Sequence, residues 1–340
     1  MKKILIGILA LAALAALGVF AYMKYYESLD KRSASFNGWL RVDGADVVNA
    51  KGKPIQLVGV STHGIQWYGD LYTKESIAGL KRDLGINVFR IAVYSDPGSD
   101  GYVKNPELKN KVYELVDACI ELDMYVVVDW HILNDNNPQL YKDKALEFFG
   151  ELSEKYADAP NVIYEICNEP NGEVDWSNDI KPYAEEVIAK IREKSQKALV
   201  IVGTGRWSTD LPSASHDALE DSNVVYALHF YAGAHNKTLR DKIDAFREKG
   251  LAVFVSECGA TDADGDGELY GEAFARWTDY MNEKGISWIY WSYTNKDEAS
   301  AMLKKDVVPS FDNEEVTIDE FLSPSGELFK REAEKLNKQQ

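Results

Sequence analysis

The sequence predicts an α/β fold: a single-domain (β/α)8 TIM barrel, preceded by a short N-terminal hairpin and an N-terminal hydrophobic export segment. Two observations predict the barrel. Eight short runs rich in apolar residues recur along the chain, and stretches with helical spacing of apolar residues lie in most of the gaps between them. Strands that alternate with helices form right-handed βαβ units and a parallel sheet, and eight such units favour closure into a barrel.

Residues 1–22 predict the export segment. The chain starts Met-Lys-Lys and then stays uncharged and mostly apolar as far as Tyr22. A signal peptide has such a basic start, followed by an apolar core of about 7–15 residues. This run is longer and approaches the roughly 20 residues that span a bilayer. A cleaved signal peptide and a retained signal anchor therefore both stay open, and we expect an exported protein: extracellular, periplasmic or at the cell surface, anchored to the membrane if residues 1–22 are retained.

The next segments lead into the barrel. Residues 23–36 are largely polar and predict a tether. Residues 40–44 and 46–54 predict a small hairpin, for which Gly52 and Pro54 supply the turn chemistry. Residues 37–340 are expected to form one domain.

The barrel elements follow in order. The eight expected strands are 55–60, 88–94, 125–130, 162–167, 198–203, 224–229, 252–256 and 287–291. The helical patterns cover 74–84, 106–122, 141–156, 180–194, 239–249, 269–284 and 323–336. Three of these patterns stop at Gly85, Gly250 and Gly285, and glycine is the residue that most often ends a helix.

Composition excludes some classes of function. The 340 residues include 55 acidic and 38 basic ones, for a formal net charge of −17. Such a surface repels phosphate backbones, so we expect no nucleic-acid partner, whereas a neutral polymer would not be repelled. The three cysteines, Cys119, Cys167 and Cys258, lie in apolar segments and are expected to be core residues without a disulfide.

Polar and aromatic residues gather where the expected strands end. Because the carboxyl ends of barrel strands form one face, where chemistry is done, these side chains are expected to lie together. A lone histidine is more often structural, but three of the five histidines stand at such ends. The residues are Ser61, Thr62, His63, Arg90, Asp129, Trp130, His131, Asn168, Glu169, His229, Phe230, Tyr231, Glu257 and Trp291.

Two glutamates stand out in this set. Glu169 follows the apolar run 161–167 and precedes Pro170, which cannot continue a strand ladder. Glu257 ends the run 251–256. A glutamate usually caps a helix or pairs with a lysine, but that role does not explain two at the ends of apolar strands. Two carboxyl groups at the ends of two different barrel strands are typical of glycosidases.

Seven stretches in order resemble glycoside hydrolase family 5 (cellulase family A), and within it the bacterial endo-β-1,4-glucanases. The resemblance covers residues 37–336. The stretches are 57–67, 87–94, 127–133, 161–172, 229–231, 254–259 and 288–296.

The resemblance implies a role for each matching residue. Glu169 would be the acid/base and Glu257 the nucleophile of a retaining mechanism, which needs carboxyl groups about 5–5.5 Å apart. Arg90 would keep Glu257 ionised. Asn168 would donate to the 2-hydroxyl of the sugar at the cleavage point. His131, His229 and Tyr231 would support these groups.

Aromatic residues indicate how a sugar polymer would bind, because the C–H faces of pyranose rings stack on tryptophan and tyrosine. Trp67, Trp130, Trp207 and Trp291 stand at or just after strand ends, whereas Trp288 is expected in the core. By resemblance, Trp291 lies under the sugar at the reaction centre, Trp67 on the non-reducing side and Trp207 on the leaving-group side. His63 and Lys296 are expected to bind sugar as well, and Tyr293 stands where leucine is common in the family.

One segment imitates a metal site. Residues 262–267, Asp-Ala-Asp-Gly-Asp-Gly, copy the opening of a calcium-binding loop, but its twelfth position is Ala273 where a glutamate is required, and Glu272 is one residue early. Related glucanases carry a similar loop without metal. We therefore expect no bound metal and no cofactor.

The sequence thus predicts a retaining endo-β-1,4-glucanase (cellulase) that cleaves internal bonds of cellulose and β-glucans. It is expected to act as a monomer, with membrane contact only through residues 1–22. A β-mannanase, xylanase or mixed-linkage glucanase of the same family is the first alternative. A carbohydrate-binding barrel without catalysis is the second, although none of the expected catalytic residues is missing.

Overall fold

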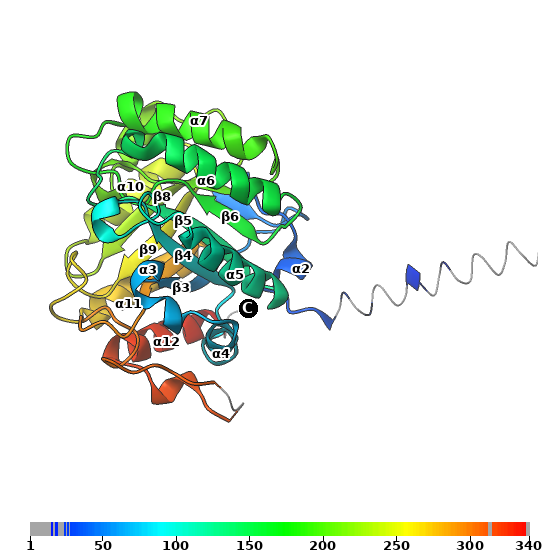
Figure 1. Ribbon diagram of the computed structural model, residues 1–340, viewed down its shortest axis with the longest axis vertical. Helices are drawn as coiled ribbons and strands as arrows, with labels where there is room; N and C mark the ends of the chain where they lie inside the picture. The colour runs from blue at the N-terminus through cyan, green and yellow to red at the C-terminus, as the bar shows by residue number, and fades with distance from the viewer. Residues whose placement is uncertain are drawn as a thin grey trace, which may run out of the picture.

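The computed structural model of the 340-residue chain describes residues 15, 18, 19, 24, 26, 28–311 and 315–337. Eight parallel strands close into a barrel in the order β10-β3-β4-β5-β6-β7-β8-β9. Helices surround the strands (Figure 1). The predicted (β/α)8 barrel is confirmed.

The eight strands lie where the sequence predicted them, with shifted ends. They are β3 (Val58–Thr62), β4 (Val88–Tyr94), β5 (Tyr125–His131), β6 (Val162–Glu165), β7 (Val200–Val202), β8 (Val224–Tyr231), β9 (Val253–Gly259) and β10 (Trp288–Tyr293).

Two differences in strand length have a physical cause. β7 begins later than predicted because the carbonyl of Ala198 accepts hydrogen bonds from side chains, Arg192 Nη1 at 2.8 Å and Asn223 Nδ2 at 3.2 Å. β8 and β9 run further than predicted because their pairing continues through polar residues, with His229 opposite Glu257. The ladder itself therefore positions these two side chains.

The predicted helices are present and cover the outside of the barrel (Figure 1). They are α4 (Lys74–Leu84), α5 (Leu108–Glu121), α6 (Lys142–Lys155), α7 (Lys181–Arg192), α10 (Lys237–Arg247), α11 (Gly271–Lys284) and α12 (Pro324–Asn337). Gly85 and Gly285 end α4 and α11 in the left-handed conformation. Gly250 lies beyond the end of α10, which stops at Arg247.

The sequence analysis did not predict the short helical turns in the loops. They are α2 (Ala34–Asn37), α3 (Ile65–Tyr68), α8 (Gly205–Ser208), α9 (Leu211–His216), η1 (Gly69–Leu71), η2 (Pro97–Ser99), η3 (Pro138–Tyr141), η4 (Trp176–Ile180) and η5 (Ile318–Glu320).

The N-terminal hairpin pairs β1 (Arg41–Asp43) with β2 (Asp46–Val48) in antiparallel register. Gly44, with φ of 62°, makes the turn between β1 and β2. Gly52, with φ of 75°, makes the next turn, after which Pro54 pairs with Val48 in an antiparallel bridge, so these two residues supply turn chemistry as predicted. Val47 packs against apolar residues at the beginnings of the barrel strands. The hairpin therefore covers the N-terminal end of the barrel, opposite the polar strand ends.

Strand alternation decides which strand-end residues face the barrel interior. On β5, Asp129 and His131 point inward, whereas Trp130 points outward and packs on Phe148, with ring centroids 5.4 Å apart. Trp130 has no exposed surface, so its interpretation as a sugar platform was wrong. Trp288 is a core residue as predicted. The three cysteines are buried and unpaired, as predicted.

The predicted export segment lies almost wholly outside the described residues, because of residues 1–22 only 15, 18 and 19 are described. Within the described part of the chain, none of the helices combines the length and apolar character needed to cross a bilayer.

Candidate active site

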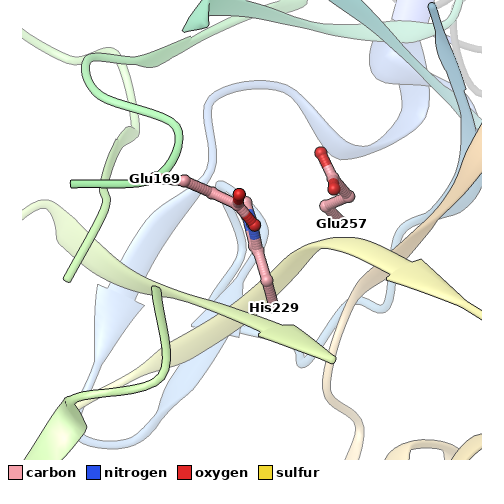
Figure 2. A group of neighbouring side chains, drawn as sticks. All are labelled: Glu169, His229 and Glu257. Atoms are coloured by element: carbon pink, nitrogen blue, oxygen red, sulfur yellow. The ribbon is translucent and has the colours of Figure 1, made fainter. Parts of the chain in front are cut away.

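Two glutamates and a histidine meet at the carboxyl end of the barrel. Figure 2 shows Glu169, His229 and Glu257 directed toward one another. One ligand atom from each of the three lies within 4.8 Å of the others. The two glutamates are largely buried, at 8% and 4% exposure. The structure therefore brings the two predicted carboxyl groups together.

Glu257 is held from two sides. Arg90 Nη1 donates to Glu257 Oε2 at 3.1 Å, and the Tyr231 hydroxyl donates to Glu257 Oε1 at 2.7 Å. Both oxygens thus accept a hydrogen bond, and the one from Arg90 is charge-assisted.

Arg90 occupies the centre of a buried charge cluster. Its guanidinium contacts three carboxylates, at 2.7 Å from Glu165, 3.0 Å from Asp129 and 3.1 Å from Glu257. Burial lowers the pKa of Arg90, but these negative charges outweigh burial and raise it above its ordinary value. The arginine is therefore a permanent cation beneath the site.

The cluster shifts the pKa values of its two deeper carboxylates, Glu165 and Asp129, in opposite directions. Burial raises the pKa of Glu165, yet the Arg90 charge, the Arg90 hydrogen bonds and the His229 ring, whose Nε2 lies 3.7 Å from Glu165 Oε1, outweigh burial and bring it to about 2. Burial and the negative charges of Glu165 and Glu257 raise the pKa of Asp129 well above its ordinary value. Glu165 is consequently the ionised partner of Arg90, and Asp129 is the carboxyl that takes up a proton most readily.

Glu169 contacts His229, whose Nδ1 lies 2.8 Å from Glu169 Oε1. On the other side of the ring, His229 Nε2 lies 3.0 Å from Ser256 Oγ. Burial lowers the pKa of His229, but hydrogen bonds to Glu165 and Glu169 and the charge of Glu257 raise it to about 10. His229 is therefore in direct contact with the acid/base candidate, and its supporting role stays a prediction.

Asn168 bridges the supporting groups. Its Oδ1 accepts from Arg90 Nη2 at 2.7 Å. Its Nδ2 donates to the Ile132 carbonyl at 3.1 Å and lies 3.3 Å from His131 Nε2. His131 Nδ1 lies 2.6 Å from Asp129, and burial together with the Arg90 charge lowers the pKa of His131 to about 4. His131 is therefore a neutral ring near neutral pH.

A cleft runs across the carboxyl end of the barrel as two adjoining hollows of about 480 and 420 Å³, which share Glu169, Trp207, Tyr231 and Ala263. The first hollow also holds Arg206, Thr209, His229 and His235. The second hollow also holds Glu257 and the supporting residue His131. The other predicted sugar contacts line it as well: His63, Trp67, Trp291 and Lys296.

Three tryptophans line the cleft as predicted. Trp67 and Trp207 are 46% and 52% exposed, a high value for so large an apolar side chain. Trp291 is recessed and stacks on His131, with ring centroids 5.3 Å apart. His63 lies beside Trp291, at 5.0 Å between centroids. Its pKa is lowered to about 3 by burial and by the charges of Lys296 and His131.

A left-handed turn presents Trp207. Arg206, Trp207 and Ser208 have φ of 56°, 55° and 54°, a conformation that costs energy in residues with a Cβ. Ser208 Oγ donates to the carbonyl of Asn168 at 2.6 Å, and Trp207 N donates to the carbonyl of Pro170 at 3.1 Å. The turn is thus tied directly to the segment that carries Glu169.

The sequence analysis gave no role to several residues of the site. Glu165 is wholly buried, and its signal was present: a charged residue inside the apolar run 161–167. Ser256 Oγ donates to Glu165 at 2.6 Å. Glu298 lines the cleft and forms an ion pair with Lys296. Asp129 was noted as a strand-end residue without a function.

The loop that imitates a calcium site borders the cleft. Ala263 lines both hollows and Asp264 the second. Asp264 Oδ1 accepts from Asp266 N at 3.1 Å, and Asp266 Oδ1 accepts from Ala299 N at 3.2 Å. These carboxylates cap turns of the loop. The expectation that the loop binds no metal stays a prediction.

Glu169, His229 and Glu257 form a group whose spacing would suit a cation. Each is already engaged with protein. His229 and Glu169 bond to each other, and Arg90 and Tyr231 occupy the two oxygens of Glu257. A guanidinium beside the group also opposes a second positive charge. We therefore interpret the group as acid–base machinery.

Comparison with known proteins agrees with this geometry. The model of the family described as cellulase (glycosyl hydrolase family 5) matches residues 48–297. Endoglucanase N of Pectobacterium atrosepticum is 48% identical over 278 residues, which is 82% of this chain and 62% of that protein. Endoglucanase A of Evansella cellulosilytica is 50% identical over 260 residues, which is 76% of this chain and 53% of that protein. The chain thus spans roughly three fifths of the length of the first relative and about half that of the second.

Solved structures have the same fold. The catalytic domain of an endoglucanase from Thermobifida fusca has a TM-score of 0.82 and 33% identity, covering 88% of this chain and 99% of that one. A structure of that domain in complex with cellotetraose is equally similar, with a TM-score of 0.82. By the family match over residues 48–297 and these relatives, the chain belongs to glycosyl hydrolase family 5.

Proposed function

We propose that the protein is a retaining endo-β-1,4-glucanase that cleaves internal bonds of cellulose and related β-glucans. The observation that carries the proposal is the Glu169–Glu257 pair on the floor of the cleft, with oxygens within 4.8 Å. A retaining glycosidase needs carboxyl groups about 5–5.5 Å apart, whereas an inverting one needs about 6.5–9.5 Å. The endoglucanase relatives support the same reaction.

In the first step, Glu169 donates its proton to the glycosidic oxygen as the bond to the anomeric carbon breaks. Glu257 attacks that carbon, and a covalent glycosyl-enzyme forms. In the second step, Glu169 takes a proton from water, whose oxygen displaces Glu257. The configuration at the anomeric carbon is inverted twice and so retained.

The surrounding residues fit these roles. Arg90 and Tyr231 each hydrogen-bond one oxygen of Glu257 and orient it for attack. Asn168 Nδ2 makes its longer contact, 3.3 Å, with His131, and a sugar 2-hydroxyl would replace that contact. A hydrogen bond to this hydroxyl strengthens as charge develops on the ring.

The cleft suggests where sugars bind. Trp291 would lie under the sugar at the reaction centre, with Trp67, His63 and Lys296 on the non-reducing side. Trp207 would take the leaving-group side. A cleft that accepts sugars on both sides of the bond suits internal cleavage of a polymer.

We further propose that residues 1–22 direct export and that residues 37–340 act as one catalytic domain and as a monomer. Membrane attachment would follow if residues 1–22 are retained, and N-terminal sequencing of the exported protein distinguishes the two fates.

Reducing-sugar release from carboxymethyl-cellulose, barley β-glucan, mannan and xylan tests the activity, with Glu169→Ala as control. Release from the first two polymers, abolished in the control, is expected. Activity confined to mannan or xylan would keep the mechanism and change the substrate. No release from any polymer would contradict catalysis, and proton NMR showing an inverted anomer at first turnover would contradict the two-step mechanism.

A further inference from the structure

Glu165 lies beneath both proposed catalytic carboxyl groups without touching either. Its side chain is wholly buried on β6. Oε2 accepts from Arg90 Nε at 2.7 Å, and Oε1 accepts from Ser256 Oγ at 2.6 Å and from Arg90 Nη2 at 3.3 Å. Arg90 contacts Glu257, and Ser256 contacts His229, the neighbour of Glu169. Glu165 therefore connects the supports of both glutamates.

The hydrogens in this series of hydrogen bonds, which runs from Glu165 through Ser256 to His229, can be assigned by counting donors and acceptors. An ionised carboxylate only accepts hydrogen bonds, and a serine hydroxyl has one hydrogen to give. Glu165 takes that hydrogen from Ser256 at 2.6 Å. Ser256 Oγ can then only accept from His229 Nε2, 3.0 Å away. The hydrogen on that side of the imidazole must therefore lie on Nε2.

This assignment decides what the other ring nitrogen does. With Nε2 protonated, Nδ1 of neutral His229 has a lone pair directed at Glu169 Oε1, 2.8 Å away. One proton is then shared between Nδ1 and Glu169: Glu169 holds it when the ring is neutral, and Nδ1 holds it when the ring is an imidazolium, the form that the raised pKa of His229 favours near neutral pH. The opposite neutral tautomer, with hydrogen on Nδ1, would make Glu169 Oε1 the acceptor, so that no proton would lie on the oxygen facing the ring.

We propose that Glu165 is a positioning residue that, through Ser256, fixes the Nε2–H tautomer of His229 and so keeps one proton shared between His229 Nδ1 and Glu169. This proposal rests on the proposed function. In the first step the shared proton passes to the leaving oxygen, and in the second step a proton from water replaces it. Atoms and charge balance over the cycle, and His229 Nε2 keeps its hydrogen throughout.

The charges around His229 support a retained proton. The facing groups come from four other parts of the barrel: Arg90 on β4, Asp129 on β5, Glu165 and Glu169 at and after β6, and Glu257 on β9, with Tyr231 on β8 itself. The carboxylates outnumber the one arginine, and the pKa of His229 is raised to about 10 by hydrogen bonds to Glu165 and Glu169 against the effect of burial. The pair thus keeps its proton through neutral pH.

The first test reads the tautomer without activity. ¹⁵N-labelled histidine NMR of the protein at pH 7 is expected to show hydrogen on His229 Nε2. In Ser256→Ala the Nε2 signal should shift, because its acceptor is lost. The matched control is Ser153→Ala, a buried serine whose hydroxyl bonds to the Gly150 carbonyl in α6 at 3.2 Å. A wild-type spectrum of neutral His229 with hydrogen on Nδ1 alone would overturn the proposal.

The second test is the pH profile of kcat/KM on soluble β-glucan. Ser256→Ala and Glu165→Gln are expected to move the alkaline limb to lower pH by about one unit and to lower kcat at pH 8 about tenfold. KM should change less than twofold, because neither side chain reaches the cleft. Ser153→Ala should match the wild type. A uniform fall of kcat/KM at all pH values, with the alkaline limb of the profile unmoved, would mean that Glu165 and Ser256 have a structural role only and would overturn the proposal.

Failure of the proposed function is distinguishable. A wild-type protein inactive on all four polymers would contradict the glucanase proposal, while the ¹⁵N spectrum would still decide the tautomer. Because Glu165→Gln also disturbs Arg90, its thermal unfolding is measured alongside. Ser256→Ala leaves the Arg90–Glu165 contact intact and keeps the inference testable if Glu165→Gln does not fold.

Discussion

Arg90 and Glu257 form an ion pair of 3.1 Å in which the guanidinium has no exposed surface. The same guanidinium also binds Glu165, Asp129 and Asn168. A planar fork of five N–H donors can satisfy so many acceptors, whereas the three hydrogens of an ammonium cannot. One side chain therefore holds the proposed nucleophile and neutralises the charge beneath it.

The Arg90→Lys variant is expected to lose both the hold on Glu257 and the neutralisation of the buried carboxylates. Carboxylates left without a partner in a buried cluster destabilise a protein by about 3–5 kcal/mol, and misplacement of Glu257 should lower kcat about a hundredfold. Urea unfolding and β-glucan hydrolysis measure the two effects. The control is Arg82→Lys, an exposed arginine paired with Asp83, for which about 1 kcal/mol or less is expected. Equal stability of the two variants would contradict the role given to Arg90.

Gly203→Ala should damage the site through the backbone. A Cβ at Gly203 would stand 2.0 Å from the carbonyl oxygen of Cys167 and 2.9 Å from that of Asn168, so the segment leading to Glu169 must shift. Overpacking of this kind costs about 1–3 kcal/mol or more. Gly205→Ala is the matched control, since its nearest neighbours are 3.8 Å away. Thermal unfolding and kcat of the two variants should differ, and similar values would contradict the close approach.

The sequence predicted the elements and the polar strand ends because both depend on short-range pattern. Strand alternation with helices specifies the barrel, and the barrel brings strand ends such as Glu169 and Glu257 together whatever their separation in sequence. The prediction that failed concerned the direction in which one side chain points. Trp130 stands between Asp129 and His131, and the period of two turns it into the core, an outcome that the alternation itself could have revealed.

Residues that act through other residues were harder to predict from the sequence. Glu165 has its partners on β4 and β9, and no local pattern indicates that Ser256 and Arg90 meet it. The turn at Trp207 was also unpredictable, because three successive non-glycine residues with positive φ contradict local preference. Tertiary hydrogen bonds to Asn168 and Pro170 hold that turn.

The pH dependence of stability should reveal the buried neutral histidines. Burial lowers the pKa of His131 to about 4, and His63 is lowered to about 3. Below a pH of about 6.5 these two histidines bind protons in the unfolded chain but stay neutral in the folded protein, so their contribution to the free energy of unfolding falls as pH falls from 6.5 toward 4. For His131 alone the loss between pH 6.5 and 5 is on the order of 2 kcal/mol.

Urea unfolding at several pH values checks this for His131→Asn, whose slope between pH 6.5 and 5 should be smaller by about one proton. The range from pH 6.5 to 5 lies above the pH at which Glu165 affects stability, since a carboxylate with a lowered pKa loses its stabilising effect only below about pH 4.5. His216→Asn, at an exposed histidine, should keep the wild-type slope. A wild-type slope in His131→Asn would contradict the neutral buried ring.

Trp67 and Trp207 should shift the position of cleavage in opposite directions. Loss of one stacking platform weakens binding by about 0.5–1.5 kcal/mol, or roughly two- to tenfold. Trp207→Ala should move cleavage of reducing-end-labelled cellopentaose toward the reducing end, because the leaving-group side holds sugars less well. Trp67→Ala should move it toward the non-reducing end. Leu140→Ala, an equally exposed apolar residue outside both hollows of the cleft, should change nothing. A shift in the same direction in both tryptophan variants would mean that the polarity of the cleft is assigned wrongly.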